Sequence, residues 1–340
     1  MFPTQNTPLP FTITPFNITT DLDALSHIWT ASLPQYPLPK ANLEALLPRQ
    51  NAHHLIARKD SDTDTDSTPI AFCLTYRTDQ VSGHIAVLAV TPAYQRQGIG
   101  SALLAEAVNK FKSNAGSASG SASEPCDVTV TVGSTFPRFW PGVPIGLGEG
   151  VLEFFSKRGF EPKSGRSVDL YQDIESFEVK EEYVSRARDA GYTFAALQED
   201  GYEECLEGQR RNFSYNADWV AMYHNLPPTT HPSSIMTAFD THGTQVGWTL
   251  MLHPSSPILK QNWAMPAVCG SKTGLIGCVG VDSEHRRRSG VGLALVAHAV
   301  EDLKRRGVQG VFVDWVSLEG FYERVGFGVW MGGYREGKIS

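Results

Sequence analysis

Gln95-Arg96-Gln97-Gly98-Ile99-Gly100 is one of two copies of a turn that decides the fold of this chain. It follows an apolar segment, 85–90, and precedes a helical pattern. The second copy, Arg287-Arg288-Ser289-Gly290-Val291-Gly292, follows the apolar segment 276–281 and again precedes a helical pattern. Such a turn directs free backbone N–H groups outward, and its glycines let a ligand approach the backbone. With the positive end of the helix dipole, each copy predicts a pyrophosphate site.

The repeat extends beyond these turns. The segment 154–160, FFSKRGF, matches 321–327, FYERVGF, in spacing and residue type. Two landmarks in the same order predict two copies of one domain, over residues 1–175 and 176–340. Strand and helix patterns alternate in both halves, so we expect an α/β fold.

The segments between the landmarks complete this prediction. We expect a strand at 168–174 to close the first half, a short helix at 318–325, and a final strand at 327–334. The polar stretch 60–68 and the small-residue tract 113–124 are typical of a loop and a linker.

Composition narrows the function classes. The 340 residues are 41% hydrophobic and 19% charged, as in a globular protein, and the net charge of −7 argues against a nucleic-acid partner. Five scattered cysteines without a C-x-x-C pair indicate reduced thiols. Since no secretory signal or membrane-spanning run is visible, we expect a cytoplasmic protein. The ten histidines form no H-x-x-x-H set, so we expect no metal.

The pattern strand, Q/R-x-x-G-x-G turn, helix, strand and F-F/Y-x-x-x-G-F resembles the GNAT superfamily of acyl-CoA-dependent N-acetyltransferases, and it covers nearly the whole chain as a tandem pair. The resemblance implies two tandem domains, each a twisted mixed sheet flanked by helices. It also implies that the turn holds the CoA pyrophosphate, that the preceding strand follows the pantetheine arm, and that two adjacent parallel strands separate there. The implied CoA-binding residues are Val90, Gln95, Arg96, Gln97, Gly98, Ile99 and Gly100 in the first half, and Val279, Gly280, Val281, Arg287, Arg288, Ser289, Gly290, Val291, Gly292 and Leu293 in the second.

Within the second turn, two arginines are distinguished by their position. Arg287 occupies the first position of the motif and is the better candidate for a CoA phosphate contact. Arg286, one residue earlier, is expected to lie at the surface only.

A narrower resemblance, to tandem glucosamine and glucosaminide N-acetyltransferases, rests on the segment 314–322, DWVSLEGFY, and on the loop 140–144. It implies acetyl-CoA as co-substrate and direct attack by an amino-sugar amine in a ternary complex. Two alternatives stay open: a GNAT enzyme that acetylates another small amine or a peptide, and a non-catalytic acyl-CoA sensor. A monomer or a homodimer fits either.

Amide formation needs a base, a donor for the developing oxyanion, and a proton for the departing thiolate. Asp314 ends an apolar strand pattern, where open α/β sheets place ligand clefts, and is the candidate base; it can instead cap a helix. Tyr322 is the candidate acid, or a core aromatic. Backbone N–H groups near Val279–Val281 are candidate oxyanion donors, or part of an ordinary buried strand.

The comparison of the two copies assigns the chemistry to one half. The first copy has Phe155 where the second has Tyr322, and it has Thr131-Val132-Gly133 where the second has Asp314. We therefore expect the C-terminal half to be catalytic and the N-terminal half to be non-catalytic or structural. Trp315 and Trp140 are candidates to stack on a sugar ring, or else core residues.

Overall fold

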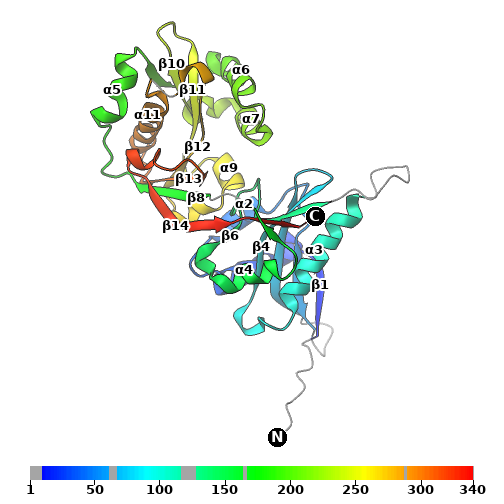
Figure 1. Ribbon diagram of the computed structural model, residues 1–340. Coiled ribbons are helices and arrows are strands. Elements are labelled where there is room, and N and C mark those ends of the chain that lie inside the picture. Colours follow the sequence, from blue (N-terminus) through cyan, green and yellow to red (C-terminus); the bar gives the residue numbers. More distant parts are fainter. Residues whose placement is uncertain (1–9, 61–66, 116–127, 164–166, 287–288, 340) are drawn as a thin grey trace, which may run out of the picture. The chain divides into compact units, whose positions relative to one another are not determined.

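The structure is a computed structural model that describes residues 10–60, 67–115, 128–163, 167–286 and 289–339. The chain forms two compact units (Figure 1). Unit 1 comprises Met1–Arg166, Trp263–Val268 and Gly333–Ser340, and unit 2 comprises Ser167–Asn262 and Cys269–Gly332.

Unit 1 is built on one mixed sheet with the strand order β1-β2-β3-β4-β5-β15-β7. Neighbouring strands are antiparallel except β4 and β5, which are parallel. Helix α3 packs on β2, β3 and β4, and α1 packs on β3 and β4. The strands are β1 (Phe11–Pro15), β2 (Leu55–Lys59), β3 (Thr68–Arg77), β4 (Ser82–Val90), β5 (Thr129–Val132), β6 (Val143–Pro144), β7 (Glu161–Pro162) and β15 (Gly337–Ile339), and the helices are α1 (Ile18–Ser32), α2 (Lys40–Leu46), α3 (Ile99–Ala115) and α4 (Glu149–Ser156).

Unit 2 repeats this plan with the order β9-β10-β11-β12-β13-β8-β14, in which β12 and β13 are the parallel pair. Helices α5 and α11 cover one face, and α6 and α7 cover the other (Figure 1). Its strands are β8 (Val168–Asp173), β9 (Thr193–Ala196), β10 (Ile235–Phe239), β11 (Gln245–Leu252), β12 (Thr273–Val281), β13 (Gly310–Val316) and β14 (Gly328–Arg335), and its main helices are α5 (Glu181–Asp189), α6 (Tyr202–Phe213), α7 (Ala217–His224) and α11 (Val291–Arg305). Its short helices are α8 (His231–Ser234) and α9 (Pro257–Asn262), whereas α10 (Met265–Cys269) lies almost wholly in unit 1.

Strand β11 lies in the centre of the second sheet, and helices pack on both faces of that sheet. All eight residues of the strand are buried, including the polar Gln245 and Thr249. A strand with two covered faces reads as a nearly continuous apolar run. The exceptions satisfy their polar atoms locally: Gln245 accepts a hydrogen bond from Trp248 Nε1 at 2.7 Å and donates to the Gly201 carbonyl at 2.7 Å.

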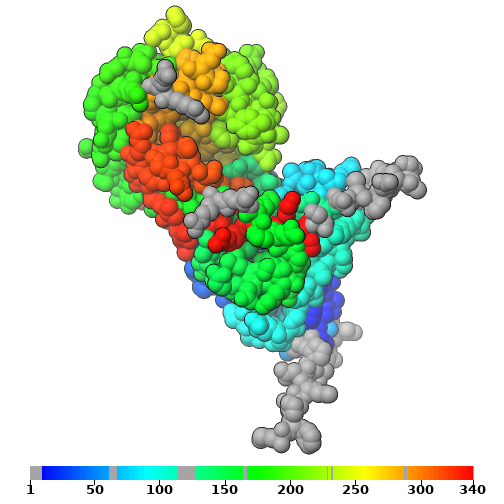
Figure 2. All heavy atoms as spheres, viewed as in Figure 1, coloured from blue at the N-terminus to red at the C-terminus, as the bar shows by residue number. Residues whose placement is uncertain are grey.

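The predicted fold class, two tandem mixed sheets flanked by helices, is confirmed, but one strand belongs to the other sheet. Strand β8, predicted to close the first half, pairs antiparallel with β13 in unit 2. Its place beside β5 in unit 1 is taken by β15 from the C-terminal end. Figure 2 shows red atoms of that end among the green atoms of unit 1. The two units thus exchange equivalent strands, and the chain divides near 166/167 rather than at 175/176.

Two further differences concern local structure. The helix predicted at 318–325 is an irregular loop followed by one 3₁₀ turn, Glu323–Val325, and Gly320 in this loop has φ +76°. The tail of β14, Tyr334 and Arg335, belongs to unit 1, where it pairs with β6. Parts of the predicted loop and linker, residues 61–66 and 116–127, lie outside the described residues.

Candidate active site

The parallel strands of unit 2 separate at the place where the second turn begins. β12 pairs with β13 only from Thr273 to Leu275, against Gly310–Phe312. Beyond this point β12 runs on to Val281 and β13 to Val316 without parallel pairing. The resemblance implied such a separation. Both strands carry a non-glycine residue with left-handed backbone past this point, Cys278 at φ +50° and Trp315 at φ +52°.

Each of these residues lies in a β-bulge. In β12, Gly277 pairs with Leu250 and Gly280 with Trp248, so that two residues, Cys278 and Val279, oppose one residue of β11. Bulges redirect the strand and the groups on it, and they occur often beside active sites. Of the candidate oxyanion donors of β12, Val279 lies in this irregular backbone, whereas Gly280 and Val281 pair with Trp248 and Gly247 of β11.

The bulge in β13 places Asp314. Val313 pairs with Leu170 and Val316 with Val168, so Asp314 and Trp315 together oppose Asp169. The fully buried Asp169 accepts a hydrogen bond from the Trp315 backbone N–H at 2.8 Å, which holds the strained residue in place. Asp314 itself is half-buried, at the edge between the apolar strand and solvent.

Tyr322 completes this group of side chains. Burial raises the pKa of its hydroxyl well above the ordinary value, and the nearby charges of Asp314 and of an ionised Cys278 raise it further. Its ring contacts Phe321 edge-on at 4.9 Å and Phe327 at 6.0 Å between centroids. The structure therefore brings Asp314, Cys278 and Tyr322 together, and it keeps the tyrosine protonated.

The two turns have the same internal packing. Gly98 has φ +86° and Gly290 has φ +72°, both in the region that favours glycine. A Cβ added at Gly100 would lie 3.5 Å from Val90 and 3.6 Å from Phe154. At Gly292 the corresponding distances are 3.7 Å to Val281 and 3.4 Å to Phe321. The matched contacts show that the sequence repeat is also a structural repeat.

The backbone of the second turn suits a pyrophosphate. Val291 and Leu293 are buried, so their side chains pack in the core. Helix α11 begins at Val291 with Gly290 as its N-cap, and its first N–H groups are those of a helix N-terminus. In the first turn, Ile99 is buried in the same way, and Gln95, Arg96 and Gln97 are exposed. Space beside Gly98 is open, since an added Cβ would meet nothing within 4 Å. The residues present fit the phosphates of CoA.

Arg286 lies at the surface, as expected, and it also bonds to the strand before the turn. Its Nε donates to the carbonyl of Val281, the last residue of β12, at 2.7 Å. Gln95 Nε2 donates in the same way to Val90, the last residue of β4, at 3.0 Å. Both side chains therefore tie a turn to the strand before it. The predicted phosphate ligands Arg287 and Arg288 lie outside the described residues.

A buried carboxylate fixes the start of the second turn. Asp282 accepts hydrogen bonds from Arg211 Nη2 at 2.7 Å and Asn212 Nδ2 at 3.0 Å, both on α6. Burial acts to raise the pKa of Asp282, but the hydrogen bonds from Asn212 and Arg211 outweigh it and hold the pKa below its ordinary value. Asn212 Oδ1 also accepts from the Ser283 backbone at 3.1 Å. Helix α6 and the turn are therefore linked.

Helix α5 and the residues after it also reach the turn, which the sequence did not indicate. Tyr192 hydrogen-bonds His285 Nδ1 through its hydroxyl at 2.8 Å. Arg186 lies beside Gly290, where an added Cβ would lie 3.1 Å from Arg186 Cβ. These residues are about 100 positions away in the chain, and no local pattern connects them to the motif.

Phe213 packs directly on the backbone of β12. A Cβ at Gly280 would lie 2.2 Å from Phe213 Cζ, and the ring is held by a stacked contact with Trp219 at 5.1 Å. Gly280→Ala should destabilise unit 2 by about 1–3 kcal/mol, the usual cost of overpacking, measured by denaturant unfolding. The control is Gly328→Ala, where an added Cβ meets nothing within 4 Å. Equal effects of the two substitutions would contradict this account.

Trp140 is a core residue. It is 3% exposed, with its ring stacked on Trp29 at 5.9 Å and edge-on to Tyr36 at 4.9 Å. Its faces are thus occupied by other side chains of unit 1, and we do not include it in a substrate site. Trp315, in contrast, is partly exposed beside Asp314.

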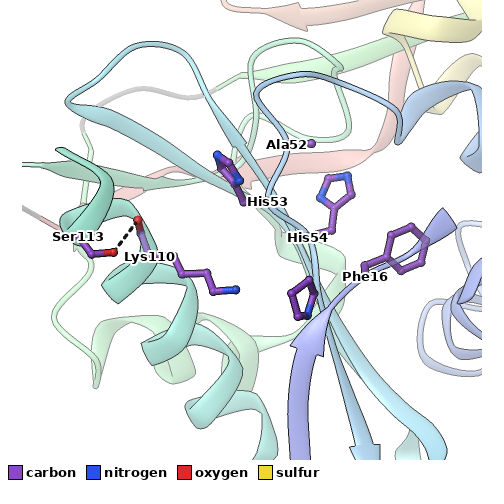
Figure 3. Close-up of a pocket in the computed structure, with 7 residues that line it drawn as sticks. Phe16, Ala52, His53, His54, Lys110 and Ser113 are labelled. Carbon is purple, nitrogen blue, oxygen red and sulfur yellow. Dashed lines mark hydrogen bonds between the residues drawn. The ribbon is translucent and has the colours of Figure 1, made fainter. Parts of the chain in front are cut away.

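Two cavities among the described residues lie in unit 1, and no residue of the two turns lines them. The larger has a volume of about 490 Å³ (Figure 3) and is lined by Pro15, Phe16, Ala52, His53, His54, Lys110 and Ser113. The second, of about 370 Å³, lies between α4 and the strands β5, β7 and β15. Burial lowers the pKa of His54 to about 4, so its ring is neutral in the wall of the larger cavity. None of the predicted site residues lines either of them.

In the described part of the chain, no group of three or more His, Cys, Asp or Glu side chains is placed to hold a metal ion. None of the helices described is both long and apolar enough to cross a membrane.

Comparisons with known proteins agree with this geometry. The chain is similar to a glucosamine N-acetyltransferase region of a fungal multi-domain GH3 β-N-acetylglucosaminidase, with 26% identity, a TM-score of 0.84 and 98% of this chain covered. The match covers 38% of that longer chain. A GCN5-related N-acetyltransferase from Sphaerobacter thermophilus has 20% identity and a TM-score of 0.66, with 97% of this chain and 96% of that chain covered.

A tandem GNAT protein from the clavulanic acid biosynthesis pathway shares the fold at 14% identity and a TM-score of 0.62, with 97% and 98% of the two chains covered. No curated protein matches the sequence. The sequence profile of the acetyltransferase (GNAT) family matches residues 22–120 and 194–327, one segment in each repeat. The chain therefore belongs to the GNAT acetyltransferase family of acyltransferases, which use acetyl-CoA.

Proposed function

We propose that this protein transfers the acetyl group of acetyl-CoA to the free amine of glucosamine or a glucosaminide, and that the domain formed by unit 2 is catalytic. The observation that carries the proposal is the separation of β12 from β13, which opens the sheet beside Asp314, Tyr322 and the second turn. The similarity to the glucosamine N-acetyltransferase region supports the choice of acceptor.

Each group has a role in this reaction. The turn holds the CoA pyrophosphate through residues 289–293, and β12 follows the pantetheine arm. Asp314 takes a proton from the ammonium form of the sugar, directly or through water, and the amine then attacks the thioester carbon. Backbone N–H groups of Val279–Val281 stabilise the oxyanion, and Tyr322 protonates the thiolate as the C–S bond breaks.

The domain formed by unit 1 takes a non-catalytic or structural role in this proposal. All of β5 pairs with β4, from Thr129 to Val132, and the Gly133 N–H extends this pairing to the Ile85 carbonyl at 2.9 Å. Beyond Ile85, β4 runs on to Val90 without parallel pairing, as β12 does beyond Leu275, so the sheet opens in both copies. The first copy lacks the two proton-transfer groups: Phe155 stands where unit 2 has Tyr322, and Thr131-Val132-Gly133 stands where unit 2 has Asp314.

We propose that Trp315 stacks on the sugar ring. It is partly exposed next to the candidate base, and its backbone is fixed by Asp169. Trp315→Ala should raise the KM for the amino sugar by about 3- to 10-fold, the worth of one aromatic contact, and leave the KM for acetyl-CoA unchanged. Steady-state kinetics with each substrate varied in turn measures both values. An unchanged sugar KM would remove Trp315 from the acceptor site.

The acceptor is tested by a free-CoA release assay with acetyl-CoA against glucosamine, chitosan oligomers, spermidine, lysine and short peptides. Turnover confined to the amino sugars supports the proposal. Turnover confined to the other amines retains the acetyltransferase and rejects the sugar. Binding of acetyl-CoA without turnover on any amine would favour a non-catalytic acyl-CoA sensor. Location in the cytoplasm, and a monomer or a homodimer, remain predictions from the sequence.

A further inference from the structure

Two buried hydroxyl groups hold consecutive carbonyls of the β12 bulge. Thr249 Oγ1 of β11 donates to the Gly277 carbonyl at 3.0 Å, and Tyr223 Oη of α7 donates to the Cys278 carbonyl at 2.8 Å. Both side chains are fully buried, at 0% exposure. The irregular backbone of the bulge is therefore held from two directions by side chains that belong to other elements.

The hydrogen bond from Tyr223 also determines where the next N–H group points. The peptide bond between Cys278 and Val279 is trans, because the only cis bond among the described residues is Phe136–Pro137. In a planar trans peptide the C=O and N–H bonds point in opposite directions. Since the Cys278 carbonyl points to Tyr223 on α7, the Val279 N–H points away from that helix.

We propose that Tyr223 is a positioning residue for the oxyanion donor of this acetyltransferase. Its hydroxyl orients the Cys278–Val279 peptide so that the Val279 N–H is directed to the thioester carbonyl of acetyl-CoA. It also polarises that peptide, because hydrogen bonds in a chain strengthen one another in a low-dielectric interior. This inference rests on the proposed function, since it needs an acetyl thioester bound along β12.

The environment of Tyr223 keeps its hydroxyl group protonated, so that the group can donate a hydrogen bond at all times. Burial raises the pKa of its hydroxyl well above the ordinary value, and the nearby Cys278, Cys205 and Tyr322 raise it further. The hydroxyl therefore remains protonated at every working pH. Removing it would leave the Cys278 carbonyl without this hydrogen bond, and the peptide would lose a restraint on its rotation.

The test compares Tyr223→Phe with Tyr202→Phe. Tyr202 Oη donates to a backbone carbonyl of the same helix pair, that of Tyr223, at 2.5 Å, so the control removes a similar bond away from the bulge. Tyr223→Phe should lower kcat by about 10- to 100-fold, less than the loss of a direct oxyanion donor, and change the KM for acetyl-CoA by less than about 2-fold. The control should retain a kcat near that of the unsubstituted protein. Thermal melting verifies that both variants fold.

A spectroscopic measurement tests the inference without an acceptor. Infrared difference spectra of bound acetyl-CoA, labelled with ¹³C at the acetyl carbonyl, report hydrogen bonding to that oxygen. The carbonyl band should shift to lower frequency on binding, and the shift should be smaller in Tyr223→Phe but not in Tyr202→Phe.

The two readouts separate the inference from the proposed function. An equal band shift and an unchanged kcat in Tyr223→Phe would overturn the positioning role while amino-sugar turnover stands. A reduced shift in a protein that acetylates no amino sugar would retain the positioning role and reject the acceptor. Failure of the protein to bind acetyl-CoA would overturn both.

Discussion

Asp314→Asn is expected to lower kcat by about 10²–10⁴, the usual contribution of a positioned general base. The carboxylate lies in the bulge at the end of β13, where the sheet opens beside the second turn. Asparagine keeps the shape of the side chain but cannot accept the proton of the ammonium group. Because only the base is removed, acetyl-CoA binding should be unchanged. Steady-state kinetics and calorimetric titration with acetyl-CoA measure the two quantities.

The matched control is Asp302→Asn. Asp302 lies on α11 and forms ion pairs with Arg305 at 2.7 Å and Arg306 at 2.9 Å. This variant loses the same charge in the same unit, but away from the opening of the sheet. The kcat of Asp302→Asn should therefore stay within about 2-fold of the value for the unsubstituted protein. If Asp314→Asn were as active as this control, the base would have to be another group.

Tyr322→Phe is expected to lower kcat by about 10²-fold or more, since the thiolate of CoA would leave without a proton donor. Phenylalanine already occupies the equivalent position in the first repeat, Phe155, so the ring packs there without its hydroxyl. The loss of kcat in Tyr322→Phe should depend on the thiol that leaves. The thiolate of a more acidic thiol leaves more easily without a proton, so the kcat for its acetyl thioester should fall less.

The pH dependence gives a second check on Tyr322. Burial, together with the charges of Asp314 and Cys278, raises the pKa of its hydroxyl above the ordinary value near 10. A raised pKa keeps the acid protonated, so its ionisation should cause no loss of kcat below about pH 10. Tyr183→Phe on α5 is the control for the loss of a tyrosine hydroxyl in unit 2. If Tyr322→Phe retained full kcat with every thioester, Tyr322 would be a packing residue.

Local sequence patterns predicted the turns, strands and helices, because these depend on interactions between neighbouring residues. The glycines of both turns need positive φ or close packing, and Gly98 and Gly290 have the expected backbone. The strands before the turns and the helices after them follow from their periodicity. The repeat could be recognised because the glycine turn and the segment FFSKRGF or FYERVGF recur in the same order. The contacts of Gly100 and Gly292 show that the two copies pack alike.

The features that depend on pairing between distant segments could not be predicted from the sequence. Strand 168–173 has the pattern of a sheet strand, but nothing in that pattern distinguishes β13 as its partner from β5. Tyr223 is 55 residues from the carbonyl it holds, and its own segment shows only a buried helical aromatic. Arg286 is exposed as expected, but its hydrogen bond to Val281 could not be predicted, because that bond depends on the course of the turn.

The sequence alone determined that this chain repeats one domain with a glycine turn, because turn geometry and periodicity depend on neighbouring residues. The resemblance of these motifs to those of tandem GNAT proteins indicated the family. It also distinguished the repeat with Asp314 and Tyr322 from the one with Phe155. Only the tertiary structure decided which strands the units exchange and where the parallel strands separate. Only it revealed which hydroxyl groups hold the bulge of β12. These features arise from contacts between segments far apart in the chain, and the free energy of such contacts is not encoded in any single segment.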